Sequence, residues 1–221
     1  MLQSETTKQA PLMSLNRFEA FSDGVFAIAV TLLVIEIKAP DLSQATSSEA
    51  IAKLLQVLPH VLSYATSFIV IGVIWINHHA LFHFIKRVDR TILVINLLLL
   101  MCVAFIPYPT ALIGEYGSSL PVVVFYGLSL AITGFAYNAL WFYVLRRYIK
   151  TEKIIHPKVV QKATIWTLSY PISYLVAAGL AFISLNLSII LYALIPAFYL
   201  LPQGNRMKIL KVPPIKEIKN W

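Results

Sequence analysis

The stretch RFEAFSDGVFAIAVTLLVIEIK, residues 17–38, joins a polar beginning to an almost continuous apolar run. The run is long enough for a membrane-crossing helix, which needs about 20 predominantly apolar residues. The polar part places Arg17, Glu19, Ser22 and Asp23 within seven residues, and Thr31 is the one polar side chain between residues 24 and 35. The stretch therefore predicts a membrane helix with two polar features that need an explanation.

The whole chain follows the same pattern. Its 221 residues are 58% hydrophobic and 13% charged, whereas soluble domains are about half apolar and about a quarter charged. The apolar residues gather in long runs, which is the membrane signature. We expect an all-α integral membrane protein, a single domain over residues 1–221 with six transmembrane helices at about residues 18–37, 57–84, 91–113, 120–145, 163–185 and 187–201. The last two form a hairpin around Asn186, and residues 202–221 are a cytoplasmic tail.

The positive charges are distributed unevenly about these spans. The net charge of +8 at first suggests a nucleic-acid binder, but 16 of the 18 lysines and arginines fall on one side of a six-span topology. Only Lys38 and Lys53 fall on the other side. Cytoplasmic loops carry the excess of basic residues, so both termini are expected in the cytoplasm. The charge then reflects topology and an affinity for anionic lipid headgroups, and no nucleic-acid partner is expected.

Helical geometry separates the two polar features of the first span. Asn16 and Glu19 have the spacing of a capping box that begins the helix. At about 100° per residue, Thr31 falls on one narrow stripe, and Glu19, Ser22 and Asp23 lie on another side. The stripe residues are Gly24, Ile28, Thr31 and Ile35. Asp23 should therefore face helices of its own subunit, where a carboxylate needs partners, while the stripe faces something else.

Thr31 also has a purely local interpretation. A threonine in a membrane helix often bonds the carbonyl four residues earlier, here that of Ala27. The sequence alone leaves both interpretations open.

A second polar cluster ends the second span, in WINHHALFHFIKRVDR, residues 75–90. His79 and His83 lie one helical turn apart, but Ala80 stands where the zinc-protease pattern needs a glutamate. We therefore expect no metal, no cofactor and no enzyme activity. His78 or His79 is a candidate partner for Asp23. Trp75 and Asn96 supply further donors, so these residues predict one buried polar network.

Several other polar and small residues have structural interpretations. Asp89 is expected to cap the third span. Asn138 should form an interhelical hydrogen bond, and Gly134 and Gly179 should permit close helix packing.

These motifs resemble one known family. RFEAFSD contains an arginine, three residues, and then phenylalanine-serine-aspartate at the start of the first span, the signature of the transmembrane protein 175 (TMEM175) potassium channels. The WINHH segment, the following Asp89 and Asn96 in the third span also resemble that family. The resemblance covers the chain as one six-span unit. The lysosomal animal form has two such units, so a single unit resembles the prokaryotic branch, whose members form homotetramers.

The resemblance implies a function and a site. It implies a potassium-permeable cation channel of the prokaryotic inner membrane, in which the first helix of four subunits lines a central pore. The sequence lacks a TVGYG carbonyl filter. By carry-over from the motif, Ile28 and Ile35 would form aliphatic constrictions, Thr31 a selectivity ring, and K⁺ would pass near Thr31 and Ile28. The residues that would brace the pore helix are Arg17, Phe21, Ser22, Asp23, Trp75, His78 and Asn96.

Two other functions remain as alternatives. A proton-conducting channel is favoured by the titratable His78, His79 and Asp23. A secondary transporter would show inverted repeats and a site at the membrane midplane, and no convincing repeat pair is present.

Overall fold

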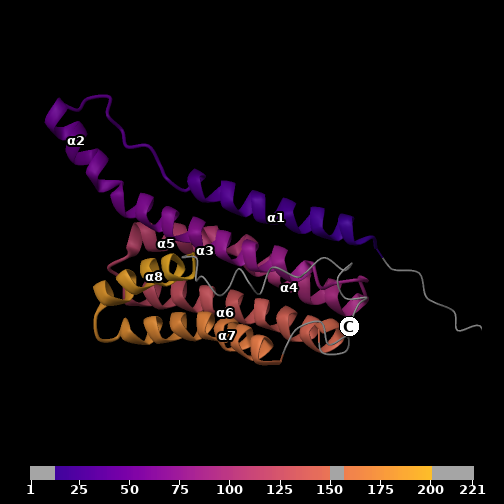
Figure 1. Ribbon diagram of the computed structural model, residues 1–221. Coiled ribbons are helices and arrows are strands. Elements are labelled where there is room, and N and C mark those ends of the chain that lie inside the picture. The colour runs from indigo at the N-terminus through magenta and orange to yellow at the C-terminus, as the bar shows by residue number, and fades with distance from the viewer. Residues whose placement is uncertain (1–12, 150–156, 201–221) are drawn as a thin grey trace, which may run out of the picture.

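The computed structural model describes residues 13–149 and 157–200 as a bundle of helices (Figure 1). Their bounds are α1 Leu15–Ile35, α2 Ser47–Gln56, α3 Leu58–Phe82, α4 Arg90–Phe105, α5 Pro107–Tyr116, α6 Leu120–Val144, the π-helical turn η1 Leu145–Ile149, α7 Pro157–Leu180 and α8 Leu185–Leu200. The predicted tail, residues 202–221, lies outside the described residues.

Four helical stretches of the described chain are long and apolar enough to cross a membrane: Leu15–Ile35, Ser47–Phe82, Arg90–Tyr116 and Leu120–Ile149. This confirms the prediction of an all-α chain with membrane-spanning helices. The helix α7 has 24 residues but falls outside this set by composition, and α8 has only 16 residues. The membrane crossing of α7 and α8, and with it the count of six spans, therefore stays a prediction.

The second predicted span has a helical extension before it. Thr46 and Glu49 form a capping box that starts α2, ten residues before the predicted start of the span at residue 57. The Lys53 ammonium group also donates to the carbonyl oxygen of Asp41, at 2.7 Å. These polar contacts let the helix begin before the apolar run does.

Two helix breaks differ from the predicted boundaries. Pro107 has no amide hydrogen to donate, and the third span divides there into α4 and α5. The turn between α7 and α8 lies at residues 181–184, so the expectation of a turn around Asn186 is wrong. The Ser184 hydroxyl accepts from the amide of Leu187 at 3.4 Å, which satisfies a free amide at the start of α8 and places Asn186 inside that helix.

Close packing of α6 against α7 organises one side of the bundle. A Cβ atom on Gly134 would meet Cβ of Pro171 at 3.0 Å, so glycine permits this close approach as predicted. The side-chain amide of Asn138 donates to the carbonyl of Thr167 at 2.9 Å, which confirms the predicted interhelical bond. A Cβ atom on Gly179 would meet no neighbouring atom of the described chain within 4 Å, so its predicted packing role is wrong.

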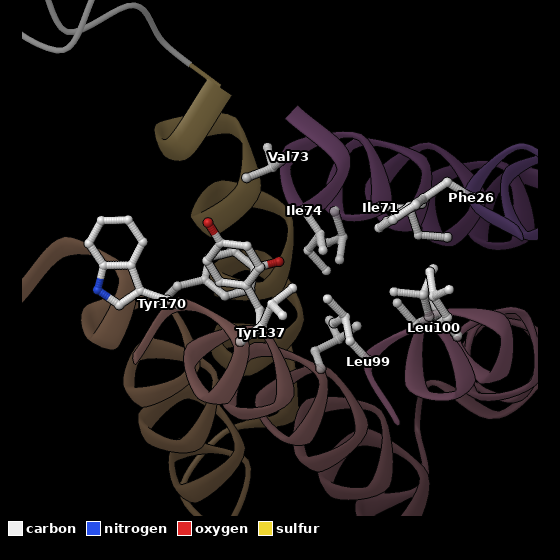
Figure 2. Packing of buried hydrophobic residues seen from close by; sticks show 14 of the residues in the cluster. Phe26, Ile71, Val73, Ile74, Leu99, Leu100, Tyr137 and Tyr170 are labelled. Atoms are coloured by element: carbon white, nitrogen blue, oxygen red, sulfur yellow. The ribbon is translucent and has the colours of Figure 1, made fainter. Parts of the chain in front are cut away.

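The helix α1 lies along the opposite side of the bundle from α7 (Figure 1). It contacts α3, α4 and α5. Figure 2 shows the apolar core that joins these elements, with Phe26 of α1, Ile71 of α3 and Leu100 of α4 at one end and Tyr137 and Tyr170 at the other. The fold thus holds α1 by one face and leaves its other face uncovered.

Candidate functional site

The helix α1 begins slightly earlier than its sequence predicts. Its N-cap is Ser14, whose side chain forms no capping bond. The capping box of Asn16 and Glu19 is therefore wrong, because both residues lie inside the helix. The apolar residues Met13 and Leu15 pack against the core, and this contact fixes the start of the helix upstream of Asn16.

One face of α1 is buried within the subunit. Its residues recur at helical spacing, and the set is Phe18, Ser22, Phe26, Ala29 and Leu33. Each is at most 3% exposed, and α1 packs by this face against its neighbours α3, α4 and α5. We call it the inner face.

The opposite face of α1 is uncovered. Ile28 and Ile35 are 60% and 69% exposed, and Gly24 and Thr31 are exposed as well. At about 100° per residue these four positions point roughly half a turn away from the inner face. We call them the outer stripe. The predicted separation of Thr31 from Ser22 is therefore present in the folded helix.

Thr31 forms the local bonds that its alternative interpretation requires. Its hydroxyl oxygen lies 3.0 Å from the carbonyl oxygen of Ala27 and 2.9 Å from that of Ile28. A hydroxyl has one hydrogen and two acceptor lone pairs. Donation of that hydrogen to the backbone leaves the lone pairs of the exposed oxygen free to accept. The local bond and a role toward a cation are therefore compatible.

Ser22 starts a buried chain of hydrogen bonds across three helices. Asn96 of α4 donates from Nδ2 to the Ser22 hydroxyl at 3.0 Å, and its Oδ1 lies 2.8 Å from Nε2 of His78 in α3. The Ser22 hydroxyl itself donates to the carbonyl of Phe18 at 3.0 Å. Because the one hydroxyl hydrogen is used there, Asn96 must donate to Ser22 and His78 must carry its proton on Nε2.

Aromatic rings enclose this chain. Phe18 stacks on Phe82 with ring centroids 4.9 Å apart, and the ring of His78 lies 4.2 Å from Phe82 and 5.2 Å from Phe26. Sequence reasoning missed Phe26 and Phe82. The position of Phe82, four residues after His78 on one helix face, was a signal that could have found it.

Asp23 binds Trp75 rather than a histidine. The indole Nε1 of Trp75 donates to the carboxylate Oδ1 at 2.8 Å. Nε2 of His78 is bonded to Asn96 and the His79 ring stacks on Trp75 at 5.8 Å, so within the described chain neither candidate histidine forms a hydrogen bond with Asp23. Asp23 and Trp75 are both exposed, so this contact lies at the edge of the α1–α3 interface.

Arg17 and Phe21 do not join the network within this subunit. Phe21 is 51% exposed. Arg17 is exposed and has no hydrogen-bond or ion-pair partner among residues 13–149 and 157–200. Five of the seven residues predicted to brace the helix therefore form hydrogen bonds between helices, in two groups: the buried Ser22, Asn96 and His78, and the exposed Asp23 and Trp75. The prediction of one buried network is wrong for Asp23 and Trp75, since both are exposed.

The remaining histidines and Asp89 have separate positions. The rings of His79 and His83 lie 5.2 Å apart, and the described chain holds no group of three metal-ligating side chains. Asp89 accepts from the amide of Ile92 at 2.9 Å, as predicted for the cap of α4. Its second carboxylate oxygen accepts from the Tyr143 hydroxyl at 2.6 Å.

The fold and motifs agree with one family of membrane proteins. A family model described as "Endosomal/lysosomal potassium channel TMEM175" matches residues 17–107, which include most of α1 and the hydrogen-bonded Ser22, His78 and Asn96. A potassium channel of Streptomyces collinus is 37% identical over 199 residues, covering 83% of this chain and 90% of the relative. One of Chamaesiphon minutus is 40% identical over 181 residues, covering 78% and 87%.

A solved structure gives the same result. The crystal structure described as a lysosomal potassium-selective channel TMEM175 homologue from Chamaesiphon minutus matches with a TM-score of 0.74 and 36% identity, over 84% of this chain and 95% of that chain. The human relative, named an endosomal/lysosomal proton channel, is 36% identical over 101 residues, which cover 43% of this chain and 20% of the relative.

These findings first define the class, which is an all-α ion channel of the membrane. The chain belongs to the TMEM175 family, on the strength of its bacterial relatives over most of both lengths.

Proposed function

We propose that the protein is a potassium-permeable cation channel of the prokaryotic inner membrane, with both termini in the cytoplasm. The observation that carries the proposal is the two-faced α1, which is buried by its inner face and exposed along Ile28, Thr31 and Ile35. The names of the bacterial relatives support the choice of potassium.

The pore requires more than one subunit. A single outer stripe cannot enclose a path, so the proposal places four copies of α1 around a central axis, in a homotetramer. An aliphatic stripe would be exposed to lipid in a monomer. Thr31 between two isoleucines is better explained by an ion path than by lipid, since a hydroxyl oxygen can replace part of the hydration of a cation.

The outer stripe divides its tasks among three residues. Four Ile28 side chains form the constriction, because an ion cannot cross an aliphatic ring without losing hydration. Ile35 forms a second aliphatic ring about two turns further along. The Thr31 hydroxyls between them face K⁺ with their free lone pairs. One hydroxyl oxygen from each of four subunits replaces only part of the hydration of the ion, so we expect a moderate preference for K⁺ over Na⁺.

The inner network holds the pore helix in place. The bonds among Ser22, Asn96 and His78 fix α1 to α4 and α3. Asp23 and Trp75 add a contact at the exposed edge. Opening widens the Ile28 ring, so α1 moves against this anchor, and Arg17 and Phe21 at the start of α1 complete the bracing in contacts outside the described subunit.

The decisive experiment is ion flux through purified protein in liposomes with K⁺ as the one permeant cation. Channel function predicts K⁺ flux that follows the imposed potential at rates far above transporter turnover. Slow, saturating flux would identify a secondary transporter instead.

Proton conduction is the second candidate, favoured by the name of the animal relatives and by two titratable residues, Asp23 of α1 and His78 of the neighbouring α3. The chain from His78 ends at the backbone carbonyl of Phe18, so it supplies no continuous path along the outer stripe. A reversal potential that follows an imposed pH gradient at constant K⁺ would favour protons over potassium.

A further inference from the structure

An open apolar groove of about 570 Å³ lies between α7 and α8. Six of the residues that line it are Ile165, Ser169, Ile172 and Val176 of α7 and Leu191 and Ile195 of α8. Its walls are exposed apolar side chains, with Ile165 61% and Val176 57% exposed. The volume falls within the range of small-molecule sites in proteins, about 300 to 1,000 Å³.

The length of the groove matches one half of a bilayer. Ile165 and Val176 are eleven positions apart on α7, which corresponds to about 17 Å at about 1.5 Å per residue. The hydrocarbon core of a membrane is about 30 Å thick, so the groove extends over about the depth of one leaflet. An acyl chain aligned with the helices has this extent.

The pairing of α7 with α6 shows at which level of the membrane the groove lies. Three contacts keep a common antiparallel register: Gly134 with Pro171, Asn138 with Thr167, and the Trp141 indole with the Thr164 hydroxyl at 3.1 Å. Continued along both helices, this register brings the first turn of α7 to the level of η1, with its exposed Arg146 and Arg147. The groove therefore begins just inside the basic edge of the α6 span.

A lysine stands at that end of the groove. Lys162 precedes Ile165 by three residues and Ser169 by seven, so it lies on the groove face of α7. It is exposed, and none of the described residues forms an ion pair with it. A lysine one turn inside a membrane edge extends its apolar stem along the helix and places its ammonium at headgroup level.

We propose that this groove binds an anionic phospholipid, with one acyl chain between α7 and α8 and the phosphate at Lys162. Charge and length together select this occupant. Lys162 favours a headgroup of net negative charge over a zwitterionic one, whose own cation offsets its phosphate, and a soluble anion would make no use of the groove. The helix α7, which supplies most of the groove residues, lies on the opposite side of the bundle from α1 (Figure 1), so it is turned toward lipid when α1 faces a central axis. Binding of the lipid itself does not depend on ion conduction.

The test measures phospholipid binding to delipidated full-length protein by native mass spectrometry. Phosphatidylglycerol and phosphatidylcholine with the same acyl chains are titrated in detergent, with and without inorganic phosphate. The variants are K162Q, which removes the charge, and V176W, which fills the groove. The controls are R90Q, which removes a charge of α4, and I132W, which adds an indole at an exposed position of α6.

Phosphatidylglycerol is expected to bind preferentially, and K162Q should weaken it about fivefold, since one lysine near a lipid surface contributes about 1 kcal/mol. V176W should abolish the preferential site, while both controls and phosphate leave it unchanged. Equal binding of the two lipids would show nonspecific lipid contact and overturn the proposal. So would an unchanged affinity in K162Q, displacement by phosphate, or a change of oligomeric state in V176W, which would identify the groove as a protein contact.

Discussion

His78 of α3 and Asn96 of α4 are joined by a hydrogen bond of 2.8 Å between Nε2 and Oδ1, and both side chains are almost completely buried, at 2% and 0% exposed. Because Asn96 also donates to Ser22, this pair is the point where α1, α3 and α4 meet. Its surroundings are aromatic rings. The loss of one partner therefore leaves the others without water to replace it.

The first prediction concerns Asn96. Asn96→Leu should destabilise the folded protein by about 1–3 kcal/mol, since it leaves the Nε2 hydrogen of His78 buried and unsatisfied. Thermal unfolding in detergent, followed by tryptophan fluorescence, measures this. The matched control is Ser129→Ala, whose exposed hydroxyl donates to the Phe125 carbonyl of its own helix and to no other described residue. Equal midpoints for N96L and the control would contradict the role of the network.

The second prediction concerns Trp75 and Asp23. Trp75→Phe keeps a ring against α1 and removes the donor to Asp23, and Asp23→Asn keeps an acceptor oxygen and removes the charge. If this bond anchors the pore helix, W75F should change open probability severalfold while D23N changes it less. The bond is partly exposed, so its loss should cost only about 1 kcal/mol of stability. Single-channel recording in planar bilayers measures the effect. Identical gating in wild type, W75F and D23N would show that the Asp23–Trp75 bond does not anchor the pore helix.

The third prediction concerns the constriction at Ile28. Ile28→Asn replaces an aliphatic ring by amides that can solvate an ion, so conductance or open probability should rise. Leu97→Asn is the control, because Leu97 is a 51% exposed apolar residue of α4, outside the proposed pore. Unchanged currents in I28N, or an equal rise in L97N, would show that Ile28 is not the gate.

The fourth prediction concerns selectivity at Thr31. Thr31→Ala removes the hydroxyl oxygen and should lower the permeability ratio of K⁺ to Na⁺ by a few fold. Thr31→Ser retains the hydroxyl and should preserve the ratio, which separates the oxygen from the shape of the side chain. Reversal potentials under biionic conditions measure the ratio. If T31A and wild type reverse at the same potential, selectivity arises elsewhere.

The fifth prediction concerns the contact of α6 with α7. Gly134→Leu should destabilise the protein by about 1–3 kcal/mol, because its side chain meets Pro171 and overpacked cores are strained. Gly179→Ala should be neutral or slightly stabilising, since no neighbouring atom of the described chain would lie within 4 Å of its Cβ and alanine favours a helix. The thermal midpoints of the two variants are compared. A midpoint of G134L equal to or above that of G179A would contradict the packing of α7 on Gly134.

The predictability of the site differed from residue to residue. The spacing of Ile28, Thr31 and Ile35 was sufficient to place them on one stripe, because a helix has a fixed angle per residue. The sequence left His78, His79 and Trp75 open as partners of Asp23, and the structure has the hydrogen bond to Trp75. The choice depends on the rotation of α3 about its own axis. That rotation is set by the packing of Phe18 on Phe82 and of His78 beside Phe26, which no local pattern encodes.

The ends of the helices also differed in how well the sequence predicted them. The cap of α4 by Asp89 could be predicted because it is a contact within four residues of chain. The start of α1 at Leu15 and the turn at residues 181–184 differed from the predicted boundaries. Both depend on which apolar side chains find a core to pack against.

The sequence by itself determined that the chain enters a membrane, which family it resembles, and which residues of α1 share a face, because composition and helical period are properties of the chain alone. Only the tertiary structure decided which partners the buried face of α1 meets, that Ser22, Asn96 and His78 form one directed chain, and that a groove follows Lys162 between α7 and α8. These features depend on the approach and rotation of helices far apart in sequence, and side-chain packing fixes both.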